Sequence, residues 1–262
     1  MPPAAVSPDI GSVGFFGKLP IRGDFISRNL PRSFLDPWDT WLQQAIARSR
    51  QQLDARWLDC YLTSPIWCFA LSPGACGPSA IAGALMPSMD RVGRYYPLVI
   101  AATLPDTPSL LTLLETGQDW FQTAEQTALK ALDEEWELEE FATRVTQIGL
   151  PPTSPETSVA SDAELSRVAW YCPLRHSVEA AGGWSPLAEY LLHHGFPQCT
   201  LWWSQGSEHI SPSLLICQGL PAIDGFAAML AGKWRERGWG ERPLQGHSRL
   251  FTVYAAGDSG LD

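Results

Sequence analysis

The chain has 262 residues, of which 45% are hydrophobic, so it is long enough to bury a sizeable core in one large domain. Its formal net charge of −10 makes nucleic acid a poor default partner, because an acidic protein repels phosphate backbones. No apolar run approaches the roughly 18 residues of a membrane helix, and the first residues lack the pattern of a signal peptide, so we expect a cytoplasmic protein without membrane insertion.

The first predicted element is a strand in "SVGFFGKL" (12–19), which leads into a glycine-rich corner. The clearest helix follows in "LDPWDTWLQQAIARSRQQL" (35–53). Asp36 suits its N-cap and Pro37 its first helical position. Apolar residues recur at helical spacing and predict a face that packs on a sheet: Trp38, Trp41, Leu42, Ala45 and Ile46.

Three strands are then predicted at 66–72, 79–88 and 96–104. Short connections rich in Gly and Pro separate them, which favours an antiparallel meander, because parallel crossovers need a dozen or more residues. A helical region at 108–132 leads into the acidic run "DEEWELEE" (133–140).

The only linker-like stretch is "GLPPTSPETSVASDAEL" (149–165), a flexible excursion within one fold that is rich in Pro, Ser and Thr. A helix at 184–195, a hairpin formed by 198–205 and 213–219, and a last helix at 223–234 complete the predicted elements.

These elements predict an α+β fold with a mainly antiparallel central sheet and helices packed on its faces. We place a single domain at 13–240 and a partly disordered C-terminal extension at 241–262. The six Cys are scattered without paired spacing, so we expect free thiols.

Three patterns imitate catalytic or metal sites. "GDSG" (257–260) matches the nucleophile motif of a protease, but the sequence ends two residues later, which leaves nothing to build a pocket around Ser259. "GFFGKLP" (14–20) lacks both the spacing and the hydroxyl residue of a phosphate-binding loop. A His/Cys cluster fits no zinc signature: His193, His194, Cys199 and His209. We therefore predict no catalytic residues, no metal and no cofactor.

Two polar, glycine-kinked turns are the more informative features. The corner in "GFFGKLPIRGDFISRNLP" (14–31) carries Lys18, Arg22, Asp24 and Arg28. The turn "MDRVGRYYP" (89–97) carries Asp90, Arg91 and Arg94. Because a partly buried Arg is usually matched by a carboxylate, we expect the two turns to meet, with Asp24 or Asp90 paired to Arg91 or Arg94. The alternative is that each turn is solvated independently.

Five segments, in this order, resemble the TagF (ImpM) family of type VI secretion-associated proteins: "GFFGKLPIRGDFISRNLP", "WDTWL", "MPSMDRVGRYYPL", "LWWSQGS" and "GLP". The resemblance covers about residues 13–235. It implies a cytoplasmic accessory protein of the bacterial type VI secretion system, with no assigned catalytic residues. It also implies a post-translational repressor that engages the forkhead-associated (FHA) scaffold protein of the system.

The leading hypothesis is thus a non-enzymatic binding regulator. The alternatives are a small-anion sensor or unrecognised enzyme that uses the polar corner, and a structural accessory subunit of the secretion apparatus. Trp136 stands among the six carboxylates of the acidic run, which is either a solvated helix end or a docking ridge. The candidate binding residues are Lys18, Arg22, Asp24, Arg28, Asp90, Arg91, Arg94 and Trp136.

Overall fold

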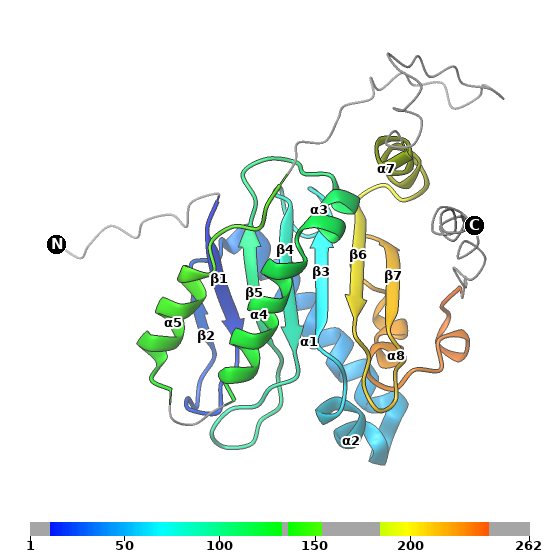
Figure 1. The fold of residues 1–262 in the computed structure, drawn as a ribbon. Coiled ribbons are helices and arrows are strands. Elements are labelled where there is room, and N and C mark those ends of the chain that lie inside the picture. The colour runs from blue at the N-terminus through cyan, green and yellow to red at the C-terminus, as the bar shows by residue number, and fades with distance from the viewer. Residues whose placement is uncertain (1–10, 133–135, 154–183, 241–262) are drawn as a thin grey trace, which may run out of the picture.

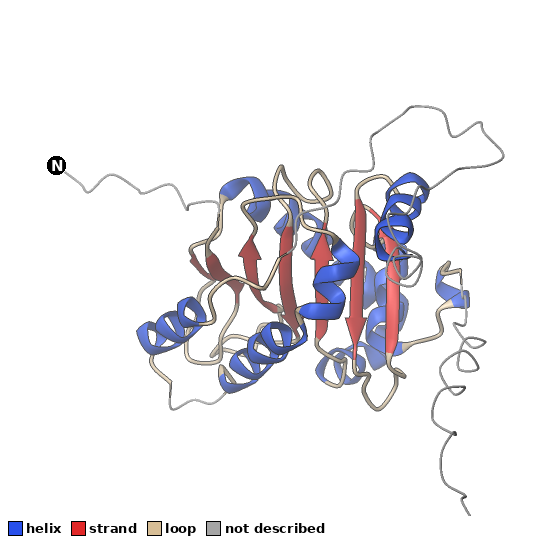
Figure 2. Ribbon diagram, turned by 45° about the horizontal axis from the view of Figure 1, so that its top comes forward, coloured by secondary structure: helices blue, strands red, loops and turns tan. Residues whose placement is uncertain are grey.

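The computed structural model describes residues 11–132, 136–153 and 184–240. Seven strands form one sheet in which every neighbouring pair is antiparallel, and helices cover both faces (Figures 1 and 2). The predicted α+β class is confirmed. Most of the excursion at 149–165, the extension at 241–262 and the Ser259 motif lie outside the described residues.

The strand order across the sheet is β2-β1-β5-β4-β3-β6-β7. The predicted meander is confirmed as β3, β4 and β5, and the predicted hairpin as β6 and β7. The short strand β2 had not been predicted. The strand bounds are Val13–Gly17 (β1), Ile26–Arg28 (β2), Trp67–Leu71 (β3), Ile81–Met86 (β4), Leu98–Thr103 (β5), Cys199–Ser204 (β6) and Ser213–Gln218 (β7).

The helices divide between the two faces of the sheet. One face carries α1 (Arg32–Leu53), α2 (Trp57–Leu62) and α8 (Phe226–Ala231), which lie behind the sheet in Figure 1. The other carries α3 (Leu110–Thr116), α4 (Gln118–Lys130) and α5 (Leu138–Gln147) in front of it. Helix α7 (Trp184–Gly195) lies beside α3 at one end of the sheet. No described helix has the length and apolarity to span a bilayer.

Helix α1 begins earlier than predicted, at Arg32, so Asp36 is not its N-cap and Pro37 lies inside it. Burial of Phe34 and Leu35 extends the helix toward the N-terminus, because both side chains join the core. Pro37 has no N–H to donate to the carbonyl of Ser33 four residues earlier, yet the helix continues.

The core lies in two layers, one on each face of the sheet. On the α1 side an aromatic cluster joins the helix to strands β3 and β6. The Trp38 ring is stacked on Trp202 with centroids 5.9 Å apart, and it lies 4.9 Å from Phe69. Trp41 is 7% exposed and its indole N–H donates to the carbonyl of Pro221 at 2.8 Å. The predicted apolar face of α1 is therefore confirmed as a buried one.

Replacing Trp41 with alanine should lower the free energy of unfolding by about 3–5 kcal/mol, because the change leaves a cavity and removes the donor to Pro221. Chemical denaturation of both proteins measures the difference. The matched control is Gln44→Ala on the exposed side of α1, which should change stability by less than about 0.5 kcal/mol. A Trp41→Ala loss as small as that of the control would contradict the packing described.

Candidate functional site

The sheet brings the two polar turns together. The corner (residues 17–28) follows β1, the turn (residues 89–97) precedes β5, and these strands are neighbours, with Phe16 opposite Val99. Gly17 has a φ of +138°, and a Cβ at this position would lie 2.1 Å from the carbonyl oxygen of Pro97. Only glycine permits this close approach of the two backbones. The expectation that the two turns meet is confirmed.

Asp90 is the centre of the contact between them. It is 2% exposed, and its Oδ2 accepts from Lys18 Nζ and from Arg94 Nε, each at 2.6 Å. Its Oδ1 accepts from the backbone N–H groups of Val92 at 3.1 Å and Arg94 at 2.8 Å. The expected pairing of Asp90 with Arg94 is confirmed, and Lys18, which is 5% exposed, is a second partner.

These donors determine the charge of Asp90. Burial by itself would raise the pKa of the carboxyl, but the hydrogen bonds from Lys18, Arg94 and Val92 outweigh burial and hold the pKa well below its usual range. Asp90 is therefore ionised at any physiological pH. An anion with so many donors is a poor proton acceptor, which favours a structural role over acid–base chemistry.

Further hydrogen bonds fix both turns to each other and to the helices behind them. The backbone N–H of Arg91 donates to the carbonyl of Arg22 at 2.9 Å, and Arg94 Nη2 donates to the carbonyl of Gly23. The hydroxyl of Tyr96 donates to Asp39 Oδ1 of α1 at 2.6 Å. The backbone of the corner is thus held from several directions.

The remaining predicted residues are arranged differently. Arg22, Asp24 and Arg91 are exposed, and their side chains form no hydrogen bond or ion pair with other described residues. Arg28 extends to α5, where its Nη2 lies 3.5 Å from Glu139 Oε1. Of the two acidic candidates, Asp90 is the one that pairs with arginine.

Trp136 lies apart from the Asp90 network. Its ring is partly buried, with its centroid 6.4 Å from that of Phe141, and the Arg144 guanidinium carbon lies 5.7 Å from the ring centroid. The Trp136 ring is therefore packed against α5 beneath a cation, and residues 133–135 of the acidic run lie outside the described residues.

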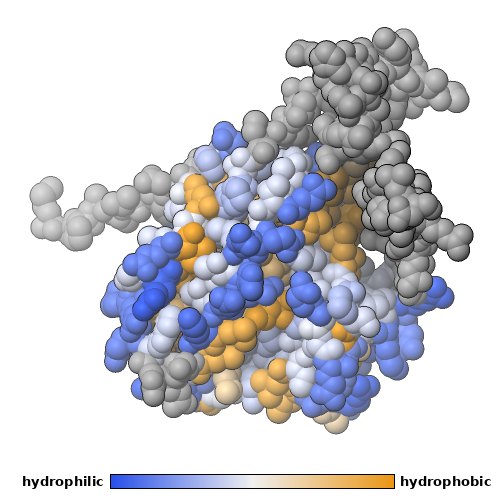
Figure 3. All heavy atoms as spheres, viewed as in Figure 1, coloured by the Kyte–Doolittle hydropathy of each residue, from blue (hydrophilic) through white to orange (hydrophobic). Residues whose placement is uncertain are grey.

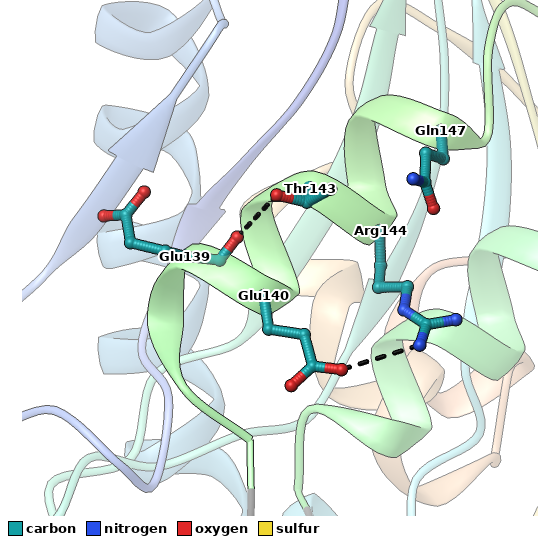
Figure 4. Close-up of a pocket in the computed structure, with 5 residues that line it drawn as sticks. All are labelled: Glu139, Glu140, Thr143, Arg144 and Gln147. Atoms are coloured by element: carbon teal, nitrogen blue, oxygen red, sulfur yellow. Dashed lines mark hydrogen bonds and ion pairs between the residues drawn. The ribbon is translucent and has the colours of Figure 1, made fainter.

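Next to Trp136, a surface hollow is lined by side chains of α5 alone: Glu139, Glu140, Thr143, Arg144 and Gln147 (Figure 4). Glu140 and Arg144 form an ion pair across it at 3.5 Å. Hydrophilic residues dominate this side of α5, at the left of Figure 3. Because a single helix lines the hollow, it offers no convergent groups to position a substrate.

The thiols of the described residues lie in the core rather than in the corner. Within the described ranges, no three His, Cys, Asp or Glu side chains are placed to hold a metal ion. Cys60, Cys68, Cys76, Cys199 and Cys217 are buried free thiols. Burial raises the pKa of Cys76 to about 12, and the pKa values of Cys199 and Cys217 are likewise raised to about 12. Such thiols are poor nucleophiles, since the thiolate is scarce at neutral pH.

Sequence reasoning missed the apolar part of the site. Phe25 is 49% exposed, Met89 38% and Val92 66%. All three lie on the same two turns as Arg22 and Arg91, and we name these five side chains the corner surface. The signal was present in the sequence, since each apolar residue stands within two positions of a charged one in a polar turn.

Comparisons with known proteins agree with one another. A sequence profile described as the TagF N-terminal domain, type VI secretion system-associated, matches residues 14–148. The crystal structure of PA0076 from Pseudomonas aeruginosa PAO1 is similar to this chain with 38% sequence identity and a TM-score of 0.75. The similarity covers 90% of this chain and 99% of that one. No curated protein matches the sequence.

The Asp90 network should make the protein sensitive to acid. A carboxyl whose pKa is lowered on folding stabilises the protein above the unfolded pKa of about 3.9, and this contribution is lost as the pH falls below that value. We expect Asp90→Asn to lower the melting temperature at pH 7, because Lys18 loses its buried counter-charge, and to flatten the decline of stability below about pH 4.

Thermal unfolding between pH 2.5 and 7 measures both effects. Asp24→Asn is the matched control, because this exposed carboxylate in the same corner has no described partner, and it should leave the profile unchanged. Equal profiles for Asp90→Asn and the control would refute the assignment.

The burial of the described cysteines predicts their reactivity. Without reductant, all six Cys of the denatured chain should be alkylated, whereas the five described Cys should react slowly in the folded protein. Intact mass after alkylation counts them, with a reduced sample as control. Fewer than six adducts without reductant, and six with it, would indicate a disulfide.

Proposed function

The chain belongs to the TagF family of type VI secretion system-associated proteins, and on this basis we propose that it represses that system after translation by binding an FHA-type scaffold protein in the cytoplasm. The similarity to the PA0076 crystal structure covers 90% of this chain. This match to the family is the observation that carries the proposal. Such a repressor needs affinity for one state of the scaffold, because binding withdraws that state from assembly by mass action.

The proposal includes a mechanism without catalysis. Two observations support a mechanism without catalysis. Each oxygen of the buried Asp90 carboxylate accepts two hydrogen bonds, and the thiols with raised pKa are buried. Residues in these states suit a framework that holds a surface in place. They do not suit proton transfer or nucleophilic attack.

The corner is the candidate binding face. Lys18, Asp90 and Arg94 hold it together from within, whereas Arg22 and Arg91 extend from it toward the solvent. Arg28 connects it to α5 through Glu139, and α5 also holds the ring of Trp136. Asp24 adds an exposed carboxylate on the same loop.

An anion sensor has less support from the geometry. Lys18 and Arg94, which an anion sensor would use as ligands, are both paired with the single carboxylate of Asp90, each at 2.6 Å. An incoming anion would have to displace a buried carboxylate, which is costly.

If binding is the whole mechanism, repression should follow the ratio of this protein to its scaffold. Deletion should raise secretion of a tube protein, and overproduction should suppress it. Across a graded expression series, repression should rise in proportion to the ratio of this protein to its scaffold and approach completion only near equal amounts, as tight one-to-one titration requires. Quantitative blots of both proteins and of the secreted tube protein measure this.

Full repression by trace, substoichiometric amounts would overturn titration and reopen a catalytic mechanism. Secretion that falls on deletion would instead indicate a structural subunit of the apparatus. The Gln44→Ala variant serves as a control for expression level, since this exposed residue lies on α1, outside the corner.

A further inference from the structure

We propose that the corner surface binds a short acidic segment of a partner protein, in which carboxylates flank an apolar anchor side chain. This inference deepens the proposed function, on which it rests for the identity of the partner. The chemistry of the segment follows from the charges and exposed apolar groups of the two turns.

The first step is the local charge. Residues 17–28 and 89–97 contain five basic and two acidic residues, a net charge of +3 in a chain whose total is −10. The corner is thus a positive patch on an acidic protein. Its field attracts carboxylates only at short range, because the rest of the chain repels large polyanions such as nucleic acid.

The second step is which cations are free to bind. Lys18 and Arg94 are paired with Asp90, and Arg28 is paired with Glu139. The guanidinium groups of Arg22 and Arg91 have no partner among the described residues. The hydrogen bond from Arg91 N–H to the Arg22 carbonyl places these two residues side by side. A guanidinium can hold a carboxylate through two parallel hydrogen bonds, so this pair suits two acidic side chains.

The third step is the apolar component. The half-exposed ring of Phe25 is held by its neighbours: it is stacked on Phe16 with centroids 5.8 Å apart, and it packs edge-to-face with Tyr96 with centroids 4.7 Å apart. Lys18 Nζ lies 4.9 Å from the centroid of the same ring. A rigid, exposed aromatic ring loses little conformational entropy when it binds.

The Asp90 turn contributes the rest of the platform. Val92 is 66% exposed, and its backbone is fixed by the hydrogen bond to Asp90 Oδ1. Met89 adds a flexible, polarisable side chain, which adapts to the shape of an apolar partner. Aromatic, Met and Arg side chains together have the composition of a protein interface.

The test begins with a phage-displayed library of random 12-residue peptides selected on the full-length protein. We expect the selected pool to be enriched several-fold in Asp and Glu around an apolar residue. Parallel selection on the Arg22→Glu, Arg91→Glu double variant should lose this enrichment. A wild-type pool without acidic enrichment, or the same pool from both proteins, would overturn the proposal.

The strongest selected peptide is then measured by fluorescence anisotropy. The double variant should bind at least tenfold more weakly, and Val92→Ser about tenfold more weakly, since burying the Val side chain contributes roughly 1.5 kcal/mol. Matched controls are the pair Arg32→Glu and Arg56→Glu, and Leu62→Ser, which change exposed residues outside the corner and should shift affinity less than twofold. Melting temperatures equal to wild type show that the variants are folded.

Two further peptides separate the sources of anionic recognition. Replacing each acidic residue with Gln should abolish binding, whereas replacement with phosphothreonine should give no tighter binding than the carboxylates. A marked preference for the phosphorylated peptide would overturn the acidic-segment assignment in favour of a phosphopeptide site.

Secretion assays on the same variants distinguish this inference from the proposed function. If the double variant loses peptide binding yet still represses, the corner surface is not the docking site and repression by binding stands. If wild-type protein fails to repress at any level, the proposed function falls, while the peptide measurements still decide the chemistry of the surface.

Discussion

The shape of the corner depends on the buried ion pair between Asp90 and Lys18. A charge taken out of water is tolerated only when its partners are fixed in position, and removing one partner leaves the other uncompensated. The two turns therefore cannot separate without either exposing Lys18 and Asp90 to solvent or leaving one of them buried without its partner. The position of every exposed group on them, including Arg22 and Arg91, follows from this internal constraint.

The sheet places that ion pair. Strands β1 and β5 are neighbours, and their ends carry the corner and the turn to the same point. Both faces of the sheet are covered with apolar and aromatic side chains, so the strands cannot slide past one another without breaking two core layers. A rigid scaffold thus supports loops whose outward side chains are available for recognition.

Much of this could be predicted from sequence because the signals are local. The stripe on α1 and the meander β3–β4–β5 follow from spacing and short connections. The place of β1 beside β5 has no local signal, since the strands are far apart in the chain. Lys18 was identified as a site residue, but its pairing with Asp90 depends on that strand order.

The predicted start of α1 is wrong for a local reason. Pro37 usually marks the first turn of a helix, but here burial of Phe34 and Leu35 extends the helix from Pro37 toward the N-terminus.

The separation of Lys18 and Asp90 along the chain also has a consequence for folding. They lie 72 positions apart, so their contact closes a long loop, and its entropic cost must be met before the ion pair contributes anything. During synthesis, β1 and β2 emerge together, but β5, which carries the turn with Asp90 to the corner, emerges well after them. The corner surface is therefore incomplete on a nascent chain that does not yet include β5. Whatever binds there recognises a protein whose first half has been completed and folded.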